Sequence, residues 1–339
     1  MPYRDEDDEE TDELVDLCLA HPAPLPRGPN GNELRVARIP LNSLNEGDFA
    51  EYVQRRQPII LTGCVDHWPA LYLWTHAYLR EKLGARRVHV ARTPDGLGDA
   101  VTRTHESRKP YFAKPHEATM EFSELLDEIE KPLDGSRAVY YCSHQDSSLT
   151  SEFEPLLDDV DASLAWADAA FGRKPSAVNF WLGEDAARTT AHADLYDNLY
   201  VVLKGTKEFT LLPPQEGHRL DRARYRAGTY AADLTLELDT PTNFVHWTQI
   251  DLESEEAARK LRPVRATVGP GELLFLPALW WHAVSQRGSR EEGADCSTVA
   301  VNYWYEGFVA MGDEADAAAE RAALRLLSEV SGVDLLSGM

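Results

Sequence analysis

The sequence predicts a mainly β fold with flanking helices, arranged as a double-stranded β-helix, or jelly roll. Many short apolar runs are separated by turn residues, which is typical of this architecture; examples are 58–61, 198–204, 207–212 and 299–304. Candidate metal ligands stand on or beside two of these runs, so we expect a reactive centre among the strands.

Residues 1–32 are expected to form an acidic N-terminal extension and a linker. The acidic run at 5–10 predicts a solvated tail. Residues 11–19 have the cap and the periodicity of an amphipathic helix, and residues 21–32 are rich in Pro and Gly, which is typical of a linker.

A catalytic domain with its own N-terminal strands and helices is expected over residues 33–310. Strands are predicted at 35–40 and 58–61, and helices at 48–54, 75–83, 123–130 and 161–171. The polar insert at 214–264 predicts a long loop that is either a functional lid or a structural excursion packing its aromatic residues on the barrel. Those residues are Tyr225, Tyr230, Phe244 and Trp247, with His246 among them.

The C-terminal residues 311–339 are predicted to be helical. Residues 316–330 are rich in Ala and Leu, and Leu324, Leu327 and Val330 recur at helical spacing. The apolar face that they form must be buried, either on the chain's own barrel or against a second subunit.

The composition limits the possible partners and compartments. The chain has 34 basic and 57 acidic residues and a net charge of −23, which argues against nucleic acid and favours basic protein substrates, although solubility alone would also explain it. No apolar run approaches the roughly 18 residues of a membrane helix, and the N-terminus is unlike a signal peptide. The four cysteines are scattered, so a reducing compartment, the cytoplasm or the nucleus, is expected.

The pattern His-x-Asp occurs twice, although about two matches to His-x-Asp/Glu are expected by chance in such a composition. His144-Gln-Asp146 precedes a polar run that predicts a turn entering a capped helix, so we do not assign it to metal binding. His192-Ala-Asp194 leads instead into the apolar run 198–204. Residues i and i+2 of a strand point to the same side, so these two side chains can share one metal.

His282 is the third candidate ligand. It follows the apolar run 271–281, which Pro277 interrupts. A single histidine in such a place is more commonly a buried core imidazole. With His192 and Asp194, however, it completes the two-histidine, one-carboxylate set by which non-haem Fe(II) oxygenases leave positions open for co-substrate and oxygen.

Residues 181–304 resemble a JmjC domain, a cupin-like fold, of the small hydroxylase branch of Fe(II)/2-oxoglutarate oxygenases. Within that branch the chain is most similar to the lysyl hydroxylases of developmentally regulated GTP-binding proteins. The resemblance covers roughly residues 45 to 335. It rests on the metal-ligand pattern and on Gln57-Pro-Ile-Ile-Leu-Thr-Gly63, His67-Trp-Pro-Ala-Leu71, Thr93-Pro-Asp-Gly96, Asn179-Phe-Trp-Leu-Gly183 and Leu276-Pro-Ala-Leu-Trp280.

The resemblance implies the metal ligands His192, Asp194 and His282, and it implies that Lys207 pairs with the distal carboxylate of 2-oxoglutarate. A lysine there makes physical sense, because an unpaired buried anion would cost several kcal/mol. Lys207 could otherwise be an ordinary solvated lysine of a hairpin. Further co-substrate positions implied in the same way are Thr189, Asn198, Tyr141 and Asn302, with Tyr140 left open as an alternative to Tyr141.

The function that the resemblance implies is hydroxylation of a protein side chain, with lysine expected, using Fe(II), O₂ and 2-oxoglutarate and releasing succinate and CO₂. It also implies a GTP-binding protein as substrate and pairing of two subunits through C-terminal helices. Glu184, Asp185 and Asp197 are candidates to hold the substrate ammonium. Three alternatives stay open: an N-methyl-lysine demethylase, a peptidase as proposed for relatives, and a metal-binding cupin that is not an oxygenase. No His-Glu-x-x-His pattern or legible nucleophile triad supports the peptidase.

Overall fold

The computed structural model describes residue 25 and residues 34–44, 47–104, 109–133, 135, 137–288 and 295–306. The predicted helix at 11–19 and the C-terminal segment 311–339 lie outside these ranges. Their helicity, and subunit pairing through the C-terminal segment, therefore stay predictions. Among the described residues, none of the helices combines the length and the apolar character needed to cross a membrane.

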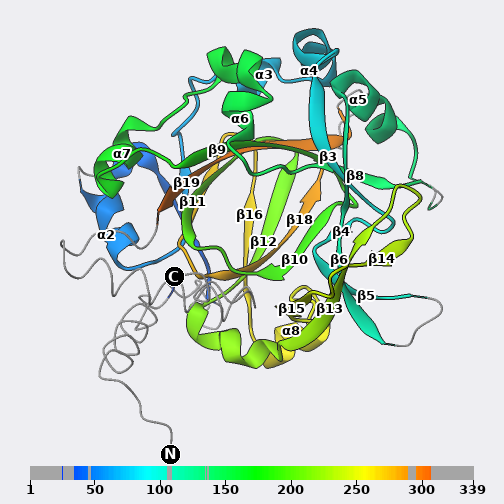
Figure 1. Ribbon diagram of the computed structural model, residues 1–339. Coiled ribbons are helices and arrows are strands. Elements are labelled where there is room, and N and C mark those ends of the chain that lie inside the picture. Colours follow the sequence, from blue (N-terminus) through cyan, green and yellow to red (C-terminus); the bar gives the residue numbers. More distant parts are fainter. Residues whose placement is uncertain are drawn as a thin grey trace, which may run out of the picture.

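Two β-sheets facing each other form the centre of the molecule (Figure 1), which confirms the predicted jelly roll. The larger has nine strands in the order β1-β2-β17-β11-β19-β9-β8-β3-β7. They are β1 (Ala37–Pro40), β2 (Ile59–Thr62), β3 (Arg87–Thr93), β7 (His116–Glu121), β8 (Val139–Cys142), β9 (Ala177–Glu184), β11 (Tyr196–Lys204), β17 (Leu273–Leu276) and β19 (Ser297–Glu306). The second sheet has the order β16-β12-β18-β10-β4. Its strands are β4 (Leu97–Gly98), β10 (Arg188–His192), β12 (Thr206–Leu212), β16 (Val264–Val268) and β18 (Trp281–Arg287).

Strand β11 is buried on both faces, which explains its continuous apolar run. Leu199 and Val201 pack into the core on the outer, helix-covered face of the large sheet. Tyr200 and Val202 point the other way and pack with Phe209 of β12 in the core between the two sheets. The site described below lies on this inner side.

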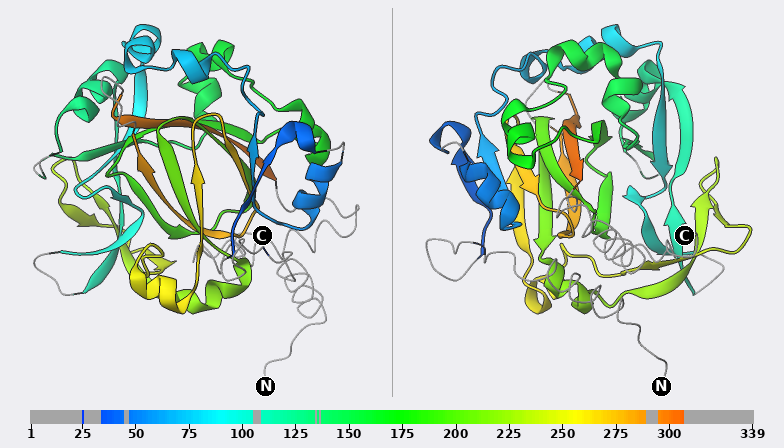
Figure 2. Two further views of the ribbon diagram at one scale, coloured as in Figure 1. Left: turned by 180° about the vertical axis from the view of Figure 1, so that it is seen from behind. Right: turned by 60° about the vertical axis from the view of Figure 1, so that its left-hand side comes forward.

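Helices cover the outer face of the nine-stranded sheet, as the two views of Figure 2 show. They are η1 (Leu41–Ser43), α2 (Asp48–Gln54), α3 (Ala70–Leu73), α4 (His76–Leu83), α5 (Phe122–Glu130), α6 (Ser148–Ser151), η2 (Glu154–Asp159) and α7 (Ala165–Phe171). Three of the four helices predicted in this region are confirmed to within one residue at each end. The fourth begins at Ala165 instead of residue 161, where the Asp161 carboxylate accepts hydrogen bonds from the side chains of His67 and Trp68.

The prediction of a long loop at 214–264 is wrong, because the insert has secondary structure of its own. It contains η3 (Pro214–Leu220), β13 (Ala223–Tyr230), β14 (Leu236–Leu238), β15 (Phe244–Trp247) and α8 (Glu255–Lys260), and β13 pairs with β6 (Pro110–Lys114), next to β5 (Ala100–Arg103). The ring of Trp247 lies 4.9 Å from that of Phe112, and its Nε1 donates to Thr190 Oγ1 at 3.0 Å. Trp247 thus anchors the insert to the barrel through Thr190 of β10.

Candidate metal and co-substrate site

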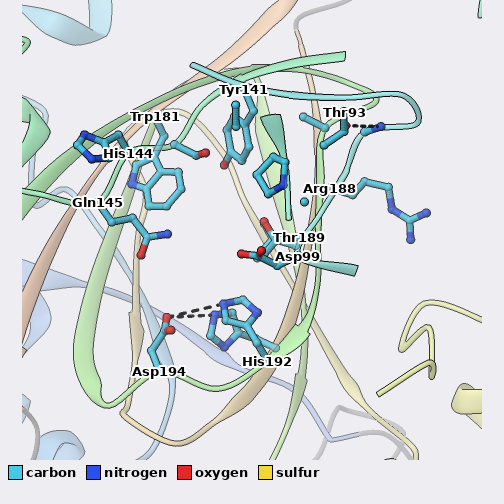
Figure 3. A pocket seen from close by; sticks show the side chains of 18 of the residues that line it. Thr93, Asp99, Tyr141, His144, Gln145, Trp181, Arg188, Thr189, His192 and Asp194 are labelled. Carbon is cyan, nitrogen blue, oxygen red and sulfur yellow. Dashed lines mark hydrogen bonds and ion pairs between the residues drawn. The ribbon is translucent and has the colours of Figure 1, made fainter. Parts of the chain in front are cut away.

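A cavity of about 340 Å³ opens between the sheets and contains most of the predicted site residues. Tyr141 lies at one end of it, and His192 and Asp194 lie at the other (Figure 3). Thr189 and Asp99 lie on the wall between these ends.

Strands β10 and β18 bring two histidines that are distant in sequence next to each other. They are antiparallel neighbours in which His192 pairs with His282, and the ring centroids are 4.1 Å apart. Oδ2 of Asp194 lies 3.8 Å from Nε2 of His192 and 3.6 Å from Nε2 of His282. All three ligand atoms can therefore approach one point to the roughly 2.1 Å of a metal bond, with other coordination positions left open.

The hydrogen bonds of the two rings direct their free nitrogens toward that point. Nδ1 of His192 donates to the carbonyl of Thr190 at 2.8 Å, and Nδ1 of His282 donates to the carbonyl of Trp280 at 2.9 Å. A carbonyl can only accept, so each Nε2 has a free lone pair. Burial, together with His192, lowers the pKa of His282 to about 4, although Asp194 opposes the shift. His282 is therefore neutral, the form that binds a metal.

Asp194 reaches the site from just beyond a strand. Strand β10 ends at His192, so alternation within one strand does not account for the pair. The backbone N–H of Leu279 donates to the carbonyl of Asp194 at 2.7 Å. This bond fixes the short connection from which the carboxylate extends.

Lys207 is 1% exposed, and no carboxylate of the described residues lies within ion-pair distance of its ammonium. Nζ donates to Tyr141 Oη at 2.9 Å and to Gln286 Oε1 at 2.6 Å. Burial lowers the pKa of Lys207 to about 7. The solvated-hairpin interpretation is therefore wrong. A buried amine with neutral partners only is a natural counter-ion for an anion that enters the cavity.

Of the two candidate tyrosines, Tyr141 lines the cavity and Tyr140 does not. Neighbouring residues of β8 point to opposite faces of the sheet. The ring of Tyr140 packs into the core under the helices, where Arg92 lies 5.5 Å from its centroid.

The other predicted co-substrate residues occupy two layers. Thr189 and Asn198 line the cavity itself. Asn302 is fully buried behind them, and its Nδ2 donates to Oδ1 of Asn198 at 2.9 Å while its Oδ1 accepts from Nε1 of Trp181 at 2.8 Å. Asn302 therefore orients Asn198 and does not line the cavity.

Gln286 belongs to the same cluster and was missed from the sequence. It accepts from Lys207, and its own Nε2 donates to the carbonyl of Glu184 at 2.8 Å. The antiparallel register of β12 and β18 places it directly opposite Lys207. The i, i+2, i+4 periodicity that starts at His282 would have indicated it.

The acidic residues proposed to hold a substrate ammonium are not on the cavity wall, which corrects that prediction. Glu184 is buried and receives two hydrogen bonds from Arg137, at 3.0 and 2.7 Å. Asp197 is buried 3.8 Å from Arg56, and burial raises its pKa to about 6 against the effect of that arginine. Asp185 accepts from the backbone N–H of Gly288 at 2.6 Å, outside the cavity.

Two other carboxylates, Asp99 and Glu117, do line the cavity. Asp99 has a left-handed backbone with φ 47°, and the hydroxyl of Thr190 donates to its backbone carbonyl at 2.6 Å. The pKa of Asp99 is raised, mainly because neighbouring protein atoms remove water from around its carboxylate. The charge of Glu117 also raises this pKa, whereas His192 and Lys114 oppose the shift. No sequence pattern marked either residue, because they come from a tight turn and from an exposed strand position.

The second His-x-Asp pattern supplies no ligand to this metal set, although His144 lies on the cavity wall. Asp146 is exposed, whereas His144 belongs to a separate group with His89 and Glu152.

The residues of the site fit the two groups that they would hold. Two neutral imidazoles and one carboxylate within 4.8 Å of one another suit a divalent transition metal. The hydroxyl of Tyr141 at the far end, with the buried ammonium of Lys207 hydrogen-bonded to it, suits a second, anionic group. An Fe(II) ion and a dicarboxylate both fit the residues present.

Comparisons with known proteins agree with this geometry. The cupin-like domain family matches residues 46–311. The lysine-specific demethylase JMJ32 of Arabidopsis thaliana is 36% identical over 273 residues, which cover 75% of this chain and 77% of that protein. The human bifunctional peptidase and (3S)-lysyl hydroxylase JMJD7 is 36% identical over 267 residues, covering 76% and 80%. The JmjC domain-containing protein E of Dictyostelium discoideum is 32% identical over 284 residues, covering 76% and 80%.

Proposed function

Because the chain belongs to the cupin-like JmjC oxygenase family, we propose that it is an Fe(II)- and 2-oxoglutarate-dependent dioxygenase that hydroxylates a protein side chain, with lysine as the target. The observation that carries the proposal is the pairing of two sites in one cavity. A set of three candidate metal ligands lies at one end, and Tyr141 lies at the other, hydrogen-bonded to the buried Lys207, which has no carboxylate partner among the described residues.

Some residues of the cavity would bind Fe(II) and 2-oxoglutarate, and others would exclude water. His192, Asp194 and His282 would hold Fe(II), which with 2-oxoglutarate supplies the oxidising chemistry that consumes O₂ and releases succinate and CO₂. Lys207 and Tyr141 would hold the distal carboxylate of 2-oxoglutarate. Asn302 keeps Asn198 oriented toward the cavity. The apolar side chains of Trp181, Tyr200, Phe209 and Val284 line the same space and limit access of water.

Three observations support lysine as the target. Asp99 and Glu117 are acidic residues of the cavity wall, and Asp99 lies between Tyr141 and the metal ligands, where a substrate ammonium can pair with it. The net charge of −23 attracts basic protein segments. The human relative carries the name of a (3S)-lysyl hydroxylase.

The test is mass spectrometry of basic peptides incubated with Fe(II)-reconstituted enzyme, O₂ and 2-oxoglutarate. The proposal expects one oxygen gained on an unmethylated lysine, with succinate formed in equal amount. Asp99→Asn should raise the KM for the peptide while leaving the binding of 2-oxoglutarate almost unchanged. Oxidised product on a side chain other than lysine would contradict the choice of residue but not the oxygenase assignment.

Demethylation is the second candidate, because the Arabidopsis relative is named as a lysine-specific demethylase at the same 36% identity. Peptides with methylated and unmethylated lysine, assayed in parallel, separate the two reactions. Loss of a methyl group without any oxygen gained on the unmethylated peptide would decide for demethylation. Cleaved peptide formed without 2-oxoglutarate would instead decide for a peptidase.

A further inference from the structure

A second cluster of metal-ligating side chains lies outside the site described above. It consists of His89 on β3, His144 in the segment that follows β8, and Glu152 directly after α6. Their ligand atoms all lie within 4.8 Å of one another, as those of the first set do. The imidazole rings of the two histidines are 4.5 Å apart.

Both histidines turn the same nitrogen toward one carboxylate oxygen. Oε1 of Glu152 lies 3.0 Å from Nδ1 of His89 and 2.7 Å from Nδ1 of His144. A cation placed among these three atoms would replace both hydrogen bonds with stronger metal–ligand bonds after only small movements of the side chains.

The protein fixes the carboxylate in place without the help of a ligand. Oε2 of Glu152 accepts from the backbone N–H of His89 at 2.7 Å, and the carbonyl of Glu152 accepts from Arg86 at 3.0 Å. Burial favours a higher pKa, but the hydrogen bonds from the His89 backbone and the two imidazoles lower the pKa of Glu152 overall. The ligand set is therefore preorganised, with its carboxylate ionised.

One side of the cluster is open to solvent. The side chains of His89 and His144 are 47% and 32% exposed, whereas that of Glu152 is only 14% exposed. An ion can enter from this side, and water can complete its coordination. Two imidazole nitrogens and one carboxylate oxygen in a roughly tetrahedral arrangement are a ligand set that Zn(II) prefers.

We infer that His89, His144 and Glu152 form a second metal site, for a Zn(II)-class cation, which is separate from the iron site. His144 and the adjacent Gln145 lie on the wall of the active cavity beside Trp181, across from Asp99 (Figure 3). Tyr141 lies only three residues before His144 in the chain. A bound ion thus ties this part of the wall to β3 and holds it in place.

Zn(II) titration of the full chain with His192→Ala and Asp194→Ala tests the site, because these substitutions disable the first metal set. The protein is first treated with a chelator to remove metal. Isothermal titration with Zn(II), and elemental analysis after excess Zn(II) has been removed, should then each show about one Zn(II) per chain. Co(II) should give the absorption of a tetrahedral site. Adding Glu152→Gln, which keeps the shape of the side chain, should weaken Zn(II) binding at least about 100-fold. Asp146→Asn, on the exposed neighbour, is the matched control and should not weaken it.

Amide hydrogen exchange tests the effect on the wall. In the protein with His192→Ala and Asp194→Ala, Zn(II) should slow amide hydrogen exchange of residues 143–152. It should have no effect on this exchange when Glu152→Gln is added. No Zn(II) binding, or equally tight binding with Glu152→Gln in a protein that stays folded by circular dichroism, would overturn the site. Tight binding with unchanged exchange would overturn the part of the inference that concerns the wall.

Discussion

At the scale of single residues, the site depends on groups whose hydrogen bonds leave one function unused. The Nδ1 atoms of His192 and His282 are occupied by carbonyls, which frees each Nε2 for a metal. Lys207 has two neutral partners but no anion. The unused Nε2 atoms and the lysine without an anion distinguish the site from a purely structural ion pair. In such a pair, as between Arg137 and Glu184, each charged group has its partner.

Lys207→Met retains the apolar stem and removes the charge. We expect the metal to bind as before, whereas 2-oxoglutarate should bind more than about 100-fold more weakly, which corresponds to about 3 kcal/mol for a buried carboxylate left without its partner. The measurement is titration of anaerobic Mn(II)-loaded enzyme with 2-oxoglutarate. Glu208→Gln, on the opposite face of the same strand, is the control. An unchanged Kd for Lys207→Met would refute the role of this lysine.

The binding of 2-oxoglutarate should also depend on pH. Burial lowers the pKa of Lys207 to about 7, so the free enzyme loses the ammonium above that pH, and binding of a carboxylate must restore the proton. By linkage, the Kd should be nearly constant below pH 7 and rise by about tenfold per pH unit above it. Titrations at saturating Mn(II) between about pH 6.5 and 8.5 measure this slope. A flat profile for the wild type, like that expected of Lys207→Met, would contradict the shifted pKa.

At the scale of elements, strand pairing assembles the site from segments far apart in the chain. The β10–β18 pair joins His192 to His282, and the β12–β18 pair joins Lys207 to Gln286. A third pair, β8–β9, places Gly183 opposite Tyr141. One strand, β18, therefore supplies both a candidate metal ligand and a hydrogen-bond partner of Lys207.

Gly183 leaves room for the two partners of Lys207. A Cβ atom at this position would lie 2.4 Å from Nε2 of Gln286 and 2.6 Å from Cδ2 of Tyr141. Gly183→Ala should displace both side chains, weaken 2-oxoglutarate binding by about tenfold and destabilise the fold by about 1–3 kcal/mol. Gly269→Ala is the control, because its Cβ would meet only Glu272, at 3.6 Å. Equal Kd values for the two variants would argue against close packing around Lys207.

The sequence predicted elements well where a periodic apolar pattern or a cap was present. Helices α2, α4 and α5 and the strand carrying Lys207 lie where the pattern placed them. The insert was misjudged because β14 and β15 are short and pair with β13, and because β13 itself pairs with β6, a strand more than 100 positions earlier in the chain. Asp197 and Glu184 were misjudged because the arginines that pair with them come from segments 141 and 47 positions away, which no local pattern reveals.

At the scale of the whole molecule, a chain with a net charge of −23 has a small cavity with two carboxylates, besides that of Asp194, on its wall. Long-range attraction brings basic segments to such a surface, and the carboxylates select among them at close range. Under the proposed function, charge would attract the substrate and the metal site would determine where it reacts.

The KM for a basic peptide should therefore rise severalfold when ionic strength increases from about 0.05 to 0.5 M, because salt screens exposed charges over a few ångströms at the higher value. Steady-state succinate formation with a lysine peptide measures it, and a peptide carrying acidic residues around the same lysine is the comparison. If the two peptides had the same KM at all salt concentrations, the acidic surface would have no part in recognition.

The most direct measurement is Fe(II)-dependent turnover of 2-oxoglutarate by single variants of the metal ligands. The enzyme is reconstituted anaerobically with Fe(II), and succinate is measured after addition of O₂. His192→Ala, Asp194→Ala and His282→Ala should each abolish succinate formation, whereas Asp146→Ala, the exposed aspartate of the other His-x-Asp pattern, should retain it. Full activity in Asp194→Ala would contradict the assignment, because the ligand set would have lost its only carboxylate, which balances the charge of the metal.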